Sequence, residues 1–153
     1  FIATGNVYGV SLPLASAVED INRLQHIKLA EKVHKYVKDS VSILGVSYKP
    51  GTPVIEASPA IPLIEDLLRR GVKVTAYDPM ANGNIKSLFK DLVIAKDLKE
   101  CISASNVWVV VTPWGIFKEI SEEYLIHNPT VIIDGWRQLG HLKNHPSVKY
   151  VGY

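Results

Sequence analysis

Cysteine is almost absent from this sequence, which contains Cys101 alone among its 153 residues. A single cysteine cannot form an internal disulfide, and the five scattered histidines do not join it in the Cys/His cluster that a structural zinc site requires. We therefore expect an intracellular protein, cytoplasmic by default, with no metal site.

Long hydrophobic runs and basic runs are also absent. The longest apolar run, residues 107–111, is far shorter than the roughly 20 residues that span a bilayer, and no signal-peptide pattern precedes it. The 17 basic and 15 acidic residues are spread along the chain and give a formal net charge of +2. The basic residues do not form a run that could bind along the phosphate backbone of a nucleic acid. We expect neither a membrane nor a nucleic acid among the partners.

What remains is the composition of a folded domain, with 47% hydrophobic and 21% charged residues. A chain of this length buries roughly 70% of the surface that it exposes when unfolded, so it can hold a core without disulfides. The numbering starts at Phe1 rather than at a methionine, and we expect a piece of a longer chain.

A long helix is predicted near the N-terminus. Ser11 supplies a capping hydroxyl, Pro13 suits the first turn, and no further proline or glycine follows until Gly45. Apolar residues recur at helical spacing within residues 14–38, at Leu14, Val18, Ile21, Leu24, Leu29, Val33 and Val37. Such a helix is about 36 Å long, more than one small domain needs. We expect it to bridge to another part of the protein and to support a homodimer.

β-rich runs alternate with helical segments after residue 40. We predict strands at residues 41–46, 73–77, 92–95, 107–111 and 131–133. We predict helices from the N-cap Ser58 to Gly71, near 84–89, and from the cap Asp97 to about Ser103. This order predicts an α/β fold, a Rossmann-like open parallel sheet (βαβαβ) preceded by one long α-helix. We divide the chain into residues 1–40, a linker with the long central helix and dimerisation region, and residues 41–153, the Rossmann-like domain.

Ligands of such sheets bind outside the carboxyl ends of the strands. These places are the loops at residues 47–57, 78–82, 112–117 and 134–138. A dinucleotide-binding turn with G-x-G-x-x-G spacing is missing, because the end of the first strand offers only Gly45 and Gly51. Asp78 has two interpretations. It is either a ribose-binding acid, although it lies 33 residues after Gly45 rather than about 20, or an Asp-Pro turn, which we favour.

The first loop carries an aromatic residue and a cation, Tyr48 and Lys49, shortly before the helix that starts at Ser58. A phosphate-bearing ligand would find positive charge and backbone donors together there. A lysine before a proline is also commonly solvated and inert, so composition alone leaves both interpretations of Lys49 open.

Three stretches nevertheless carry a resemblance in order and spacing: Ile-Leu-Gly-Val-Ser-Tyr-Lys-Pro-Gly-Thr at 43–52, Ser-Pro-Ala at 58–60 and Gly-Val-Lys-Val-Thr-Ala-Tyr-Asp-Pro at 71–79. Residues 112–114 with Phe117, residues 132–135, and residues 14–25 with Asn22 extend it over essentially the whole chain. The sequence resembles the C-terminal domain of the UDP-glucose/GDP-mannose dehydrogenase family, with the central helix that precedes it.

The resemblance implies a two-domain, NAD-dependent nucleotide-sugar 6-dehydrogenase. Such an enzyme oxidises the sugar C6 alcohol to a carboxylate through a thiohemiacetal on a cysteine, with two NAD molecules as acceptors. The N-terminal half binds NAD and the C-terminal half binds the nucleotide part of a UDP-sugar or another nucleotide-sugar. The resemblance assigns substrate contacts to Tyr48, Lys49 and Arg137. It also implies that the NAD site and the catalytic cysteine belong to a part of the protein that this sequence lacks.

Two residues depart from the family pattern. Glu56 stands where relatives carry an arginine that contacts NAD, and Trp136 stands where many relatives have arginine, one place before Arg137. We therefore assign no cofactor-binding residue to this chain. Cys101 lies inside a predicted helix without a His or Lys partner, so we interpret it as a core thiol and assign no catalytic residue. His141 and His145 have i,i+4 spacing, but a third metal ligand is missing.

Three hypotheses follow. The first is the nucleotide-sugar-binding half of an oxidoreductase, inactive alone and marked by selective binding of UDP or a UDP-sugar. The second is a non-catalytic oligomerisation or scaffold module with drifted ligand loops, marked by dimerisation without nucleotide binding. The third, an independent NAD enzyme, has little support without the glycine-rich fingerprint.

Overall fold

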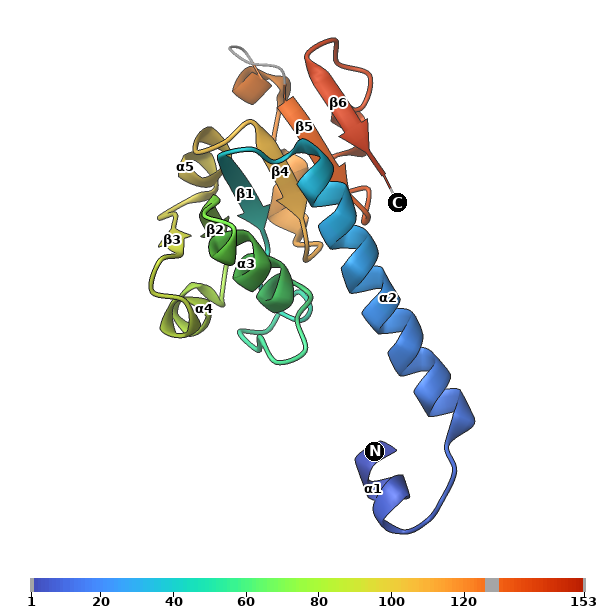
Figure 1. Ribbon diagram of the computed structural model, residues 1–153. Coiled ribbons are helices and arrows are strands. Elements are labelled where there is room, and N and C mark those ends of the chain that lie inside the picture. The colour runs from blue at the N-terminus through green and yellow to red at the C-terminus, as the bar shows by residue number, and fades with distance from the viewer. Residues whose placement is uncertain (1, 126–129, 153) are drawn as a thin grey trace.

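The computed structural model describes residues 2–125 and 130–152 and is shown in Figure 1. Its strands are β1 (Ser40–Leu44), β2 (Lys73–Tyr77), β3 (Val93–Ile94), β4 (Val107–Val110), β5 (Thr130–Asp134) and β6 (Val148–Val151). Its α-helices are α1 (Ile2–Val7), α2 (Pro13–Tyr36), α3 (Ala60–Arg69), α4 (Asn82–Leu88) and α5 (Leu98–Ser103). Short 3-10 helices lie at η1 (Gly115–Glu119), η2 (Glu122–Leu125) and η3 (Gly140–Leu142).

The strands form one six-stranded sheet in the order β3-β2-β1-β4-β5-β6, and all neighbouring pairs are parallel. The α/β, Rossmann-like fold predicted from the sequence is therefore confirmed, and so is the long helix before it. The predicted range 73–77 coincides with β2. β6, at the edge of the sheet, was not predicted from the sequence.

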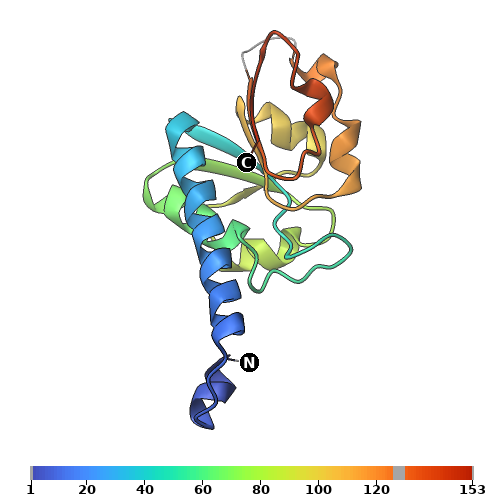
Figure 2. The same ribbon diagram turned by 90° about the vertical axis from the view of Figure 1, so that its right-hand side faces the viewer.

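Two hydrophobic layers cover the sheet. Alternate side chains of β4 illustrate the division, because Val107 and Val109 pack with α2, α3 and α4 while Trp108 and Val110 pack with α5 and the 3-10 helices. Figure 2 shows α2 on one side of the sheet and the 3-10 helices on the other. The continuous apolar run of β4 is fully buried, as expected of a parallel strand covered on both faces.

The predicted caps of α2 and α5 have different outcomes. Asp97 caps α5, accepting a hydrogen bond from the backbone N–H of Glu100 at 2.8 Å, as predicted. The predicted cap of the long helix is wrong: Leu12 occupies the N-cap position of α2 without a side-chain hydrogen bond, and Ser11 lies one residue too early. Pro13 does occupy the first helical position, where its missing N–H costs no hydrogen bond.

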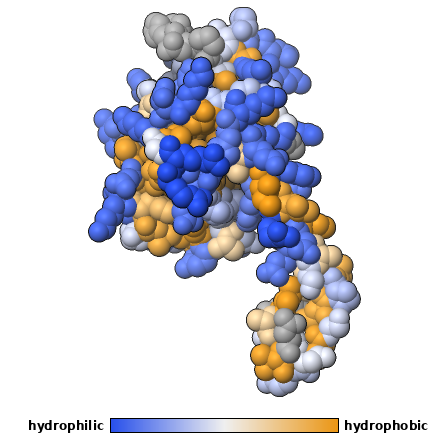
Figure 3. All heavy atoms as spheres, in the orientation of Figure 1, coloured by the Kyte–Doolittle hydropathy of each residue, from blue (hydrophilic) through white to orange (hydrophobic). Residues whose placement is uncertain are grey.

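Only the C-terminal part of α2 packs on the sheet, where Leu29 and Val33 are buried. The N-terminal part extends away from it and ends near α1 (Figure 1). Its apolar residues Leu14, Val18 and Ile21 are 79%, 50% and 55% exposed. Figure 3 shows hydrophobic side chains over this projecting part of the molecule.

None of the helices in residues 2–125 and 130–152 combines the length and the apolar character that crossing a bilayer requires.

Candidate functional site

The carboxyl edge of the sheet contains the point at which the strand order reverses. β1 lies between β2 and β4: the chain moves outward from β1 to β2 and β3, and then returns to the other side of β1 at β4. α3 then covers one face and α5 covers the other. In sheets of this topology, ligands bind in the crevice beside that point. The loops that follow β1, β2, β4 and β5 therefore define the candidate site.

Gly45 ends β1 in a left-handed conformation, with φ of +85°. A Cβ atom at this position would lie 2.6 Å from the Cβ of Thr112 and 2.8 Å from its backbone nitrogen. Glycine is therefore required because the loop after β1 crosses close to the loop after β4. In a phosphate-binding turn, the space beside such a glycine is open to the pyrophosphate, whereas here Thr112 occupies it.

Asp78, at the end of β2, is fully buried. Its Oδ2 accepts hydrogen bonds from the N–H groups of Val46 and Ser47, the Ser47 hydroxyl and the indole N–H of Trp114, at 2.8 to 3.0 Å. Its Oδ1 accepts two more, from the backbone N–H groups two and three residues later. Both oxygens are thus occupied, so the ribose-binding interpretation of Asp78 is wrong. The turn interpretation accounts for Oδ1 only.

The loop after β1 presents Tyr48 and Lys49 to solvent; the Tyr48 side chain is 56% exposed. The loop is closed by a hydrogen bond from the Tyr48 N–H to the Val54 carbonyl at 2.8 Å. A second bond, from the side chain of Asn84 in α4 to the Pro53 carbonyl at 2.8 Å, ties the loop to the body of the domain. The aromatic ring and the ammonium group are therefore displayed on an anchored loop.

The N-terminus of α3 follows directly. Ala57 adopts a left-handed conformation, with φ of +60°, which is strained for a residue with a Cβ. The Ser58 hydroxyl accepts the N–H of Ala60 at 3.2 Å, but Pro59 occupies the N-cap position of α3 and the helix begins at Ala60, so the predicted N-cap is one residue too early. Glu56 is exposed just before this turn. Its negative charge near a helix N-terminus repels an anionic ligand from that part of the edge.

The loop after β5 is organised by Asp134. Its carboxylate accepts the backbone N–H groups of Trp136 and Leu139 and the hydroxyl of Tyr150, at 3.0, 2.8 and 2.9 Å. Between them, Arg137 adopts φ of +57° and points its exposed side chain outward from a strained turn. The same loop holds the buried, unpartnered Oε1 of Gln138.

A cavity of about 340 Å³ lies where α2 passes this edge. It is lined by Asn22, Gln25, His26, Leu29, Pro59, Val111, Gly135 and Trp136. Trp136 is 55% exposed, and its indole N–H donates to the Val111 carbonyl at 2.8 Å. Tyr48, Lys49 and Arg137 lie on loops of the same sheet edge but do not line this cavity. Gln25 and His26, one helical turn before the buried Leu29, are the polar residues in the sequence that could have indicated this cavity.

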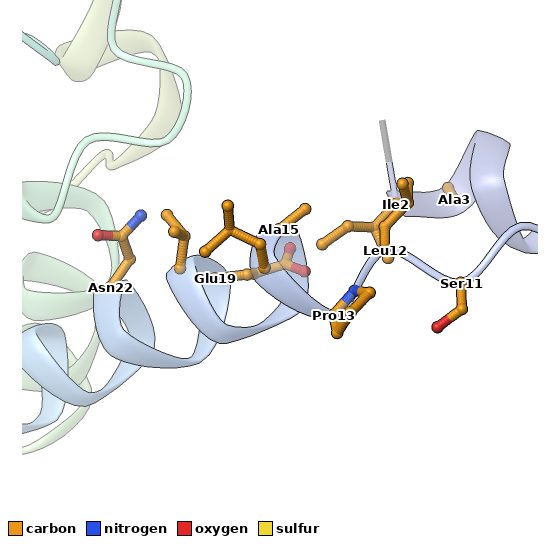
Figure 4. Close-up of a pocket in the computed structure, with 10 residues that line it drawn as sticks. Ile2, Ala3, Ser11, Leu12, Pro13, Ala15, Glu19 and Asn22 are labelled. Carbon is orange, nitrogen blue, oxygen red and sulfur yellow. The ribbon is translucent and has the colours of Figure 1, made fainter.

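A larger groove, about 880 Å³, lies between α1 and the start of α2 (Figure 4), in the part of the molecule that projects away from the sheet (Figure 1). Ile2, Leu12 and Pro13 form an apolar part of its wall, and Glu19 and Asn22 lie farther along α2. The groove lacks the convergent polar groups of a small-molecule site. It belongs instead to the exposed apolar surface at the N-terminal end of the molecule.

The remaining candidate groups are engaged in the fold. Burial, with a smaller contribution from Glu100, raises the pKa of the Cys101 thiol to about 12. His141 contacts the Ile120 carbonyl at 2.7 Å, and His145 accepts the N–H of Ser147 at 3.2 Å. Within residues 2–125 and 130–152, no three His, Cys, Asp or Glu side chains gather as a metal site would require.

The turn after β1 does not have the geometry of a dinucleotide-binding turn. Thr112 occupies the space beside Gly45 through which a pyrophosphate would approach the backbone. Glu56 places a negative charge near the N-terminus of α3. The turn after β1 and the segment before α3 are therefore unsuited to holding a pyrophosphate.

Comparisons with known proteins agree with this architecture. A model of the UDP-glucose/GDP-mannose dehydrogenase family, UDP binding domain, matches residues 42–141. UDP-glucose 6-dehydrogenase AglM of Haloferax volcanii is 31% identical over 139 residues, which cover 89% of this chain and 32% of that protein. UDP-glucose 6-dehydrogenase of Rickettsia prowazekii is 33% identical over 118 residues, covering 74% and 26% respectively.

Two solved structures share the fold. A UDP-glucose dehydrogenase from Pyrobaculum islandicum aligns with a TM-score of 0.79 and 22% identity over 99% of this chain and 34% of its own. A GDP-mannose dehydrogenase from Pseudomonas aeruginosa aligns with a TM-score of 0.76 and 18% identity, covering 99% and 36%. This chain thus spans about a quarter to a third of the length of these relatives. With the sheet, the anchored loops and the family match taken together, the chain belongs to the UDP-glucose/GDP-mannose dehydrogenase family and contains its UDP binding domain.

Proposed function

We propose that this chain is the nucleotide-sugar-binding part of an NAD-dependent 6-dehydrogenase that oxidises the sugar C6 alcohol to a uronic acid. The observation that carries the proposal is the anchored pair Tyr48 and Lys49 at the strand-order reversal of a UDP binding domain. The chain contains neither a glycine-rich NAD turn nor a reactive cysteine, so by itself it binds substrate without oxidising it.

Each proposed contact has a physical role. Tyr48 offers an exposed aromatic face to a base or a sugar ring. Lys49 and Arg137 offer exposed cations to a diphosphate, and arginine can bind two phosphate oxygens at once. The hydrogen bonds of Asp78 and Asp134 hold the backbone on which these residues stand, which reduces the ordering cost of binding.

We propose that NAD and the catalytic cysteine belong to an N-terminal domain of the same protein. Residues 1–40 then serve as the linker and central helix, and residues 41–153 as the nucleotide-sugar-binding domain. The projection of α2 beyond the sheet supports this division, because a helix that packs only at its C-terminal end has a surface left for another domain or subunit. The cytoplasmic location expected from the sequence stays a prediction.

We further propose that the exposed stripe of Leu14, Val18 and Ile21 pairs with a second copy of the chain. Exposed apolar side chains that are contiguous along a helix favour association. If this pairing is the only function of the chain, the scaffold hypothesis replaces the substrate-binding one. Sedimentation analysis of the wild-type chain and of Ile21→Lys tests the pairing, with a dimer expected for the first and a monomer for the second. A monomeric wild-type chain would contradict it.

Calorimetric titration with UDP, UDP-glucose, GDP-mannose and NAD tests the substrate-binding function. We expect saturable binding of a UDP ligand and no binding of NAD. Lys49→Ala removes a charge-assisted contact and should weaken binding about tenfold or more. Lys73→Ala, an exposed lysine at the opposite end of the sheet, is the matched control and should bind as the wild type does. Dimerisation without any nucleotide binding would favour the scaffold hypothesis instead.

A further inference from the structure

We propose that Asp78 and Trp114 are positioning residues of the nucleotide-sugar site, which lock Ser47 and thereby fix the direction in which Tyr48 and Lys49 leave the sheet. The proposal rests on the proposed function for its ligand, but its structural part concerns this chain alone. Asp78 is fully buried, and the indole N–H of the half-buried Trp114 is already engaged by Asp78 and Ser47. Their effect is transmitted through the backbone of the loop after β1.

Ser47 is held at every polar atom that it has. Its N–H and hydroxyl both donate to Asp78 Oδ2 at 2.9 Å. Its hydroxyl oxygen also accepts the indole N–H of Trp114 at 3.1 Å. Its carbonyl accepts the hydroxyl of Thr112 at 2.6 Å. A residue bonded in this way has a fixed φ and ψ, and the next two residues along the chain are Tyr48 and Lys49.

Asp78 joins the carboxyl ends of three strands. It stands at the end of β2, receives donors from the loop after β1, and receives the Trp114 indole from the loop after β4. No Lys, Arg or His among residues 2–125 and 130–152 forms an ion pair with it. Six N–H and O–H donors therefore stabilise this buried negative charge. In phosphate-binding loops, converging backbone N–H groups bind an anionic ligand in a similar way. Here the protein supplies the anion.

Aspartate is required for this arrangement. An asparagine would direct an NH₂ group at some of these donors, which include the backbone N–H groups of Val46 and Ser47, and would leave buried N–H groups unsatisfied. Asp78→Asn is therefore expected to destabilise the whole carboxyl edge and is a poor probe of positioning. Trp114 is the better probe, because it is only half-buried and its indole N–H can be removed while an aromatic ring is kept.

Trp108 is a control tryptophan in the strand that precedes the loop of Trp114. Trp108 lies in β4, and its buried indole N–H donates to the carbonyls of Ile102 and Ser105 at 2.9 and 2.8 Å, on the α5 side of the sheet. Trp108→Phe and Trp114→Phe each delete one indole N–H from a tryptophan of β4 or the loop after it. Only the second deletion touches Asp78 and Ser47.

The experiment compares the two variants of this chain, which has its own sheet and two buried hydrophobic layers, by two measurements. The first is amide hydrogen exchange without ligand, read at Ser47 and Tyr48 and normalised to the unfolding midpoint of each variant. The second is titration with UDP. Trp114→Phe should exchange these two amides at least about tenfold faster than Trp108→Phe and should bind UDP about tenfold more weakly.

The outcomes are separable. If Trp114→Phe protects Ser47 and Tyr48 as well as Trp108→Phe does, the positioning role is overturned, whether or not UDP binds. If the exchange differs but UDP affinity is equal in the two variants, the lock exists and does not orient the ligand-binding residues, which also overturns the proposal. If the wild-type chain binds no UDP, the proposed function fails, and the exchange measurement still decides whether the lock exists.

Discussion

The Nε2 atom of His34 lies 2.6 Å from Oδ2 of Asp66, so a residue near the end of α2 is joined to α3 across a part-buried contact. Arg69 and Arg70 contact the same carboxylate at 2.9 and 3.1 Å, but their side chains are largely exposed. The His34 contact therefore adds a polar link between α2 and α3 to the packing of the buried Leu29 and Val33 on the sheet. It helps to set the direction in which α2 projects.

Asp66→Asn should destabilise the chain by about 1 kcal/mol at neutral pH. Burial raises the pKa of this carboxyl, but hydrogen bonds from Arg70, His34 and Arg69 outweigh it and lower the pKa below 3.8. A lowered folded-state pKa stabilises the fold above the unfolded value, and this contribution is lost as the pH falls below it. Urea unfolding at pH 7 and pH 3 should show the difference between wild type and variant shrink at pH 3. An equal difference at both values would contradict the assignment.

Gly45→Ala should be severely destabilising, by about 3 kcal/mol or more, because it combines a left-handed backbone with a clash against Thr112. Gly71→Ala is the matched control. Gly71 has φ of +78° but no atom within 4 Å of the added Cβ, so only the backbone strain remains, about 1 kcal/mol. Thermal unfolding measures both. Equal losses would show that the close approach to Thr112 contributes nothing.

Tyr150→Phe should cost about 1 kcal/mol, because it removes the hydroxyl that donates to Asp134 at 2.9 Å. Burial and this hydrogen bond raise the pKa of Tyr150, so the hydroxyl stays a donor throughout the neutral range. The variant should also loosen the turn at Arg137, seen as faster exchange of the Leu139 amide. Tyr124→Phe, at an exposed tyrosine, serves as the control; an unchanged Leu139 amide in Tyr150→Phe would refute the proposed linkage.

Cys101 should not react with a thiol reagent such as 5,5′-dithiobis(2-nitrobenzoate) in the native chain at pH 8. Its side chain is fully buried, and its pKa of about 12 leaves almost no thiolate at that pH. One thiol should appear when the chain is unfolded in guanidinium. Rapid reaction of the native chain would mean that α5 opens readily or that the thiol is exposed.

Local sequence chemistry was sufficient for the elements whose boundaries are set by neighbouring residues. Gly71 and the Asp-Pro pair after residue 77 delimit β2, and the apolar run of β4 needs no partner to be recognised. β6 was missed because it is a half-exposed edge strand of four residues, stabilised by pairing with β5 rather than by its own pattern. Helix α1 was missed for a similar reason, since its six residues contain glycine and carry no helical signal.

The candidate site was only partly predictable. Loops at the carboxyl edge follow from strand order, so the positions of Tyr48, Lys49 and Arg137 at that edge could be anticipated. The bonds that shape those loops could not, because Asp78 meets Ser47 and Trp114 across 31 and 36 residues of sequence. The left-handed conformation of Arg137 likewise depends on Asp134 and Tyr150 rather than on a turn residue.

Nuclear magnetic resonance can decide whether the carboxyl edge of the sheet binds the nucleotide of a nucleotide-sugar. Isotope-labelled chain would be titrated with UDP, and the changes in backbone amide shifts mapped onto the structure. We expect saturable changes concentrated in residues 47–57 and 134–138. Changes concentrated instead around Tyr36 and Ser40, at the amino ends of the strands, or no changes at millimolar UDP, would contradict it.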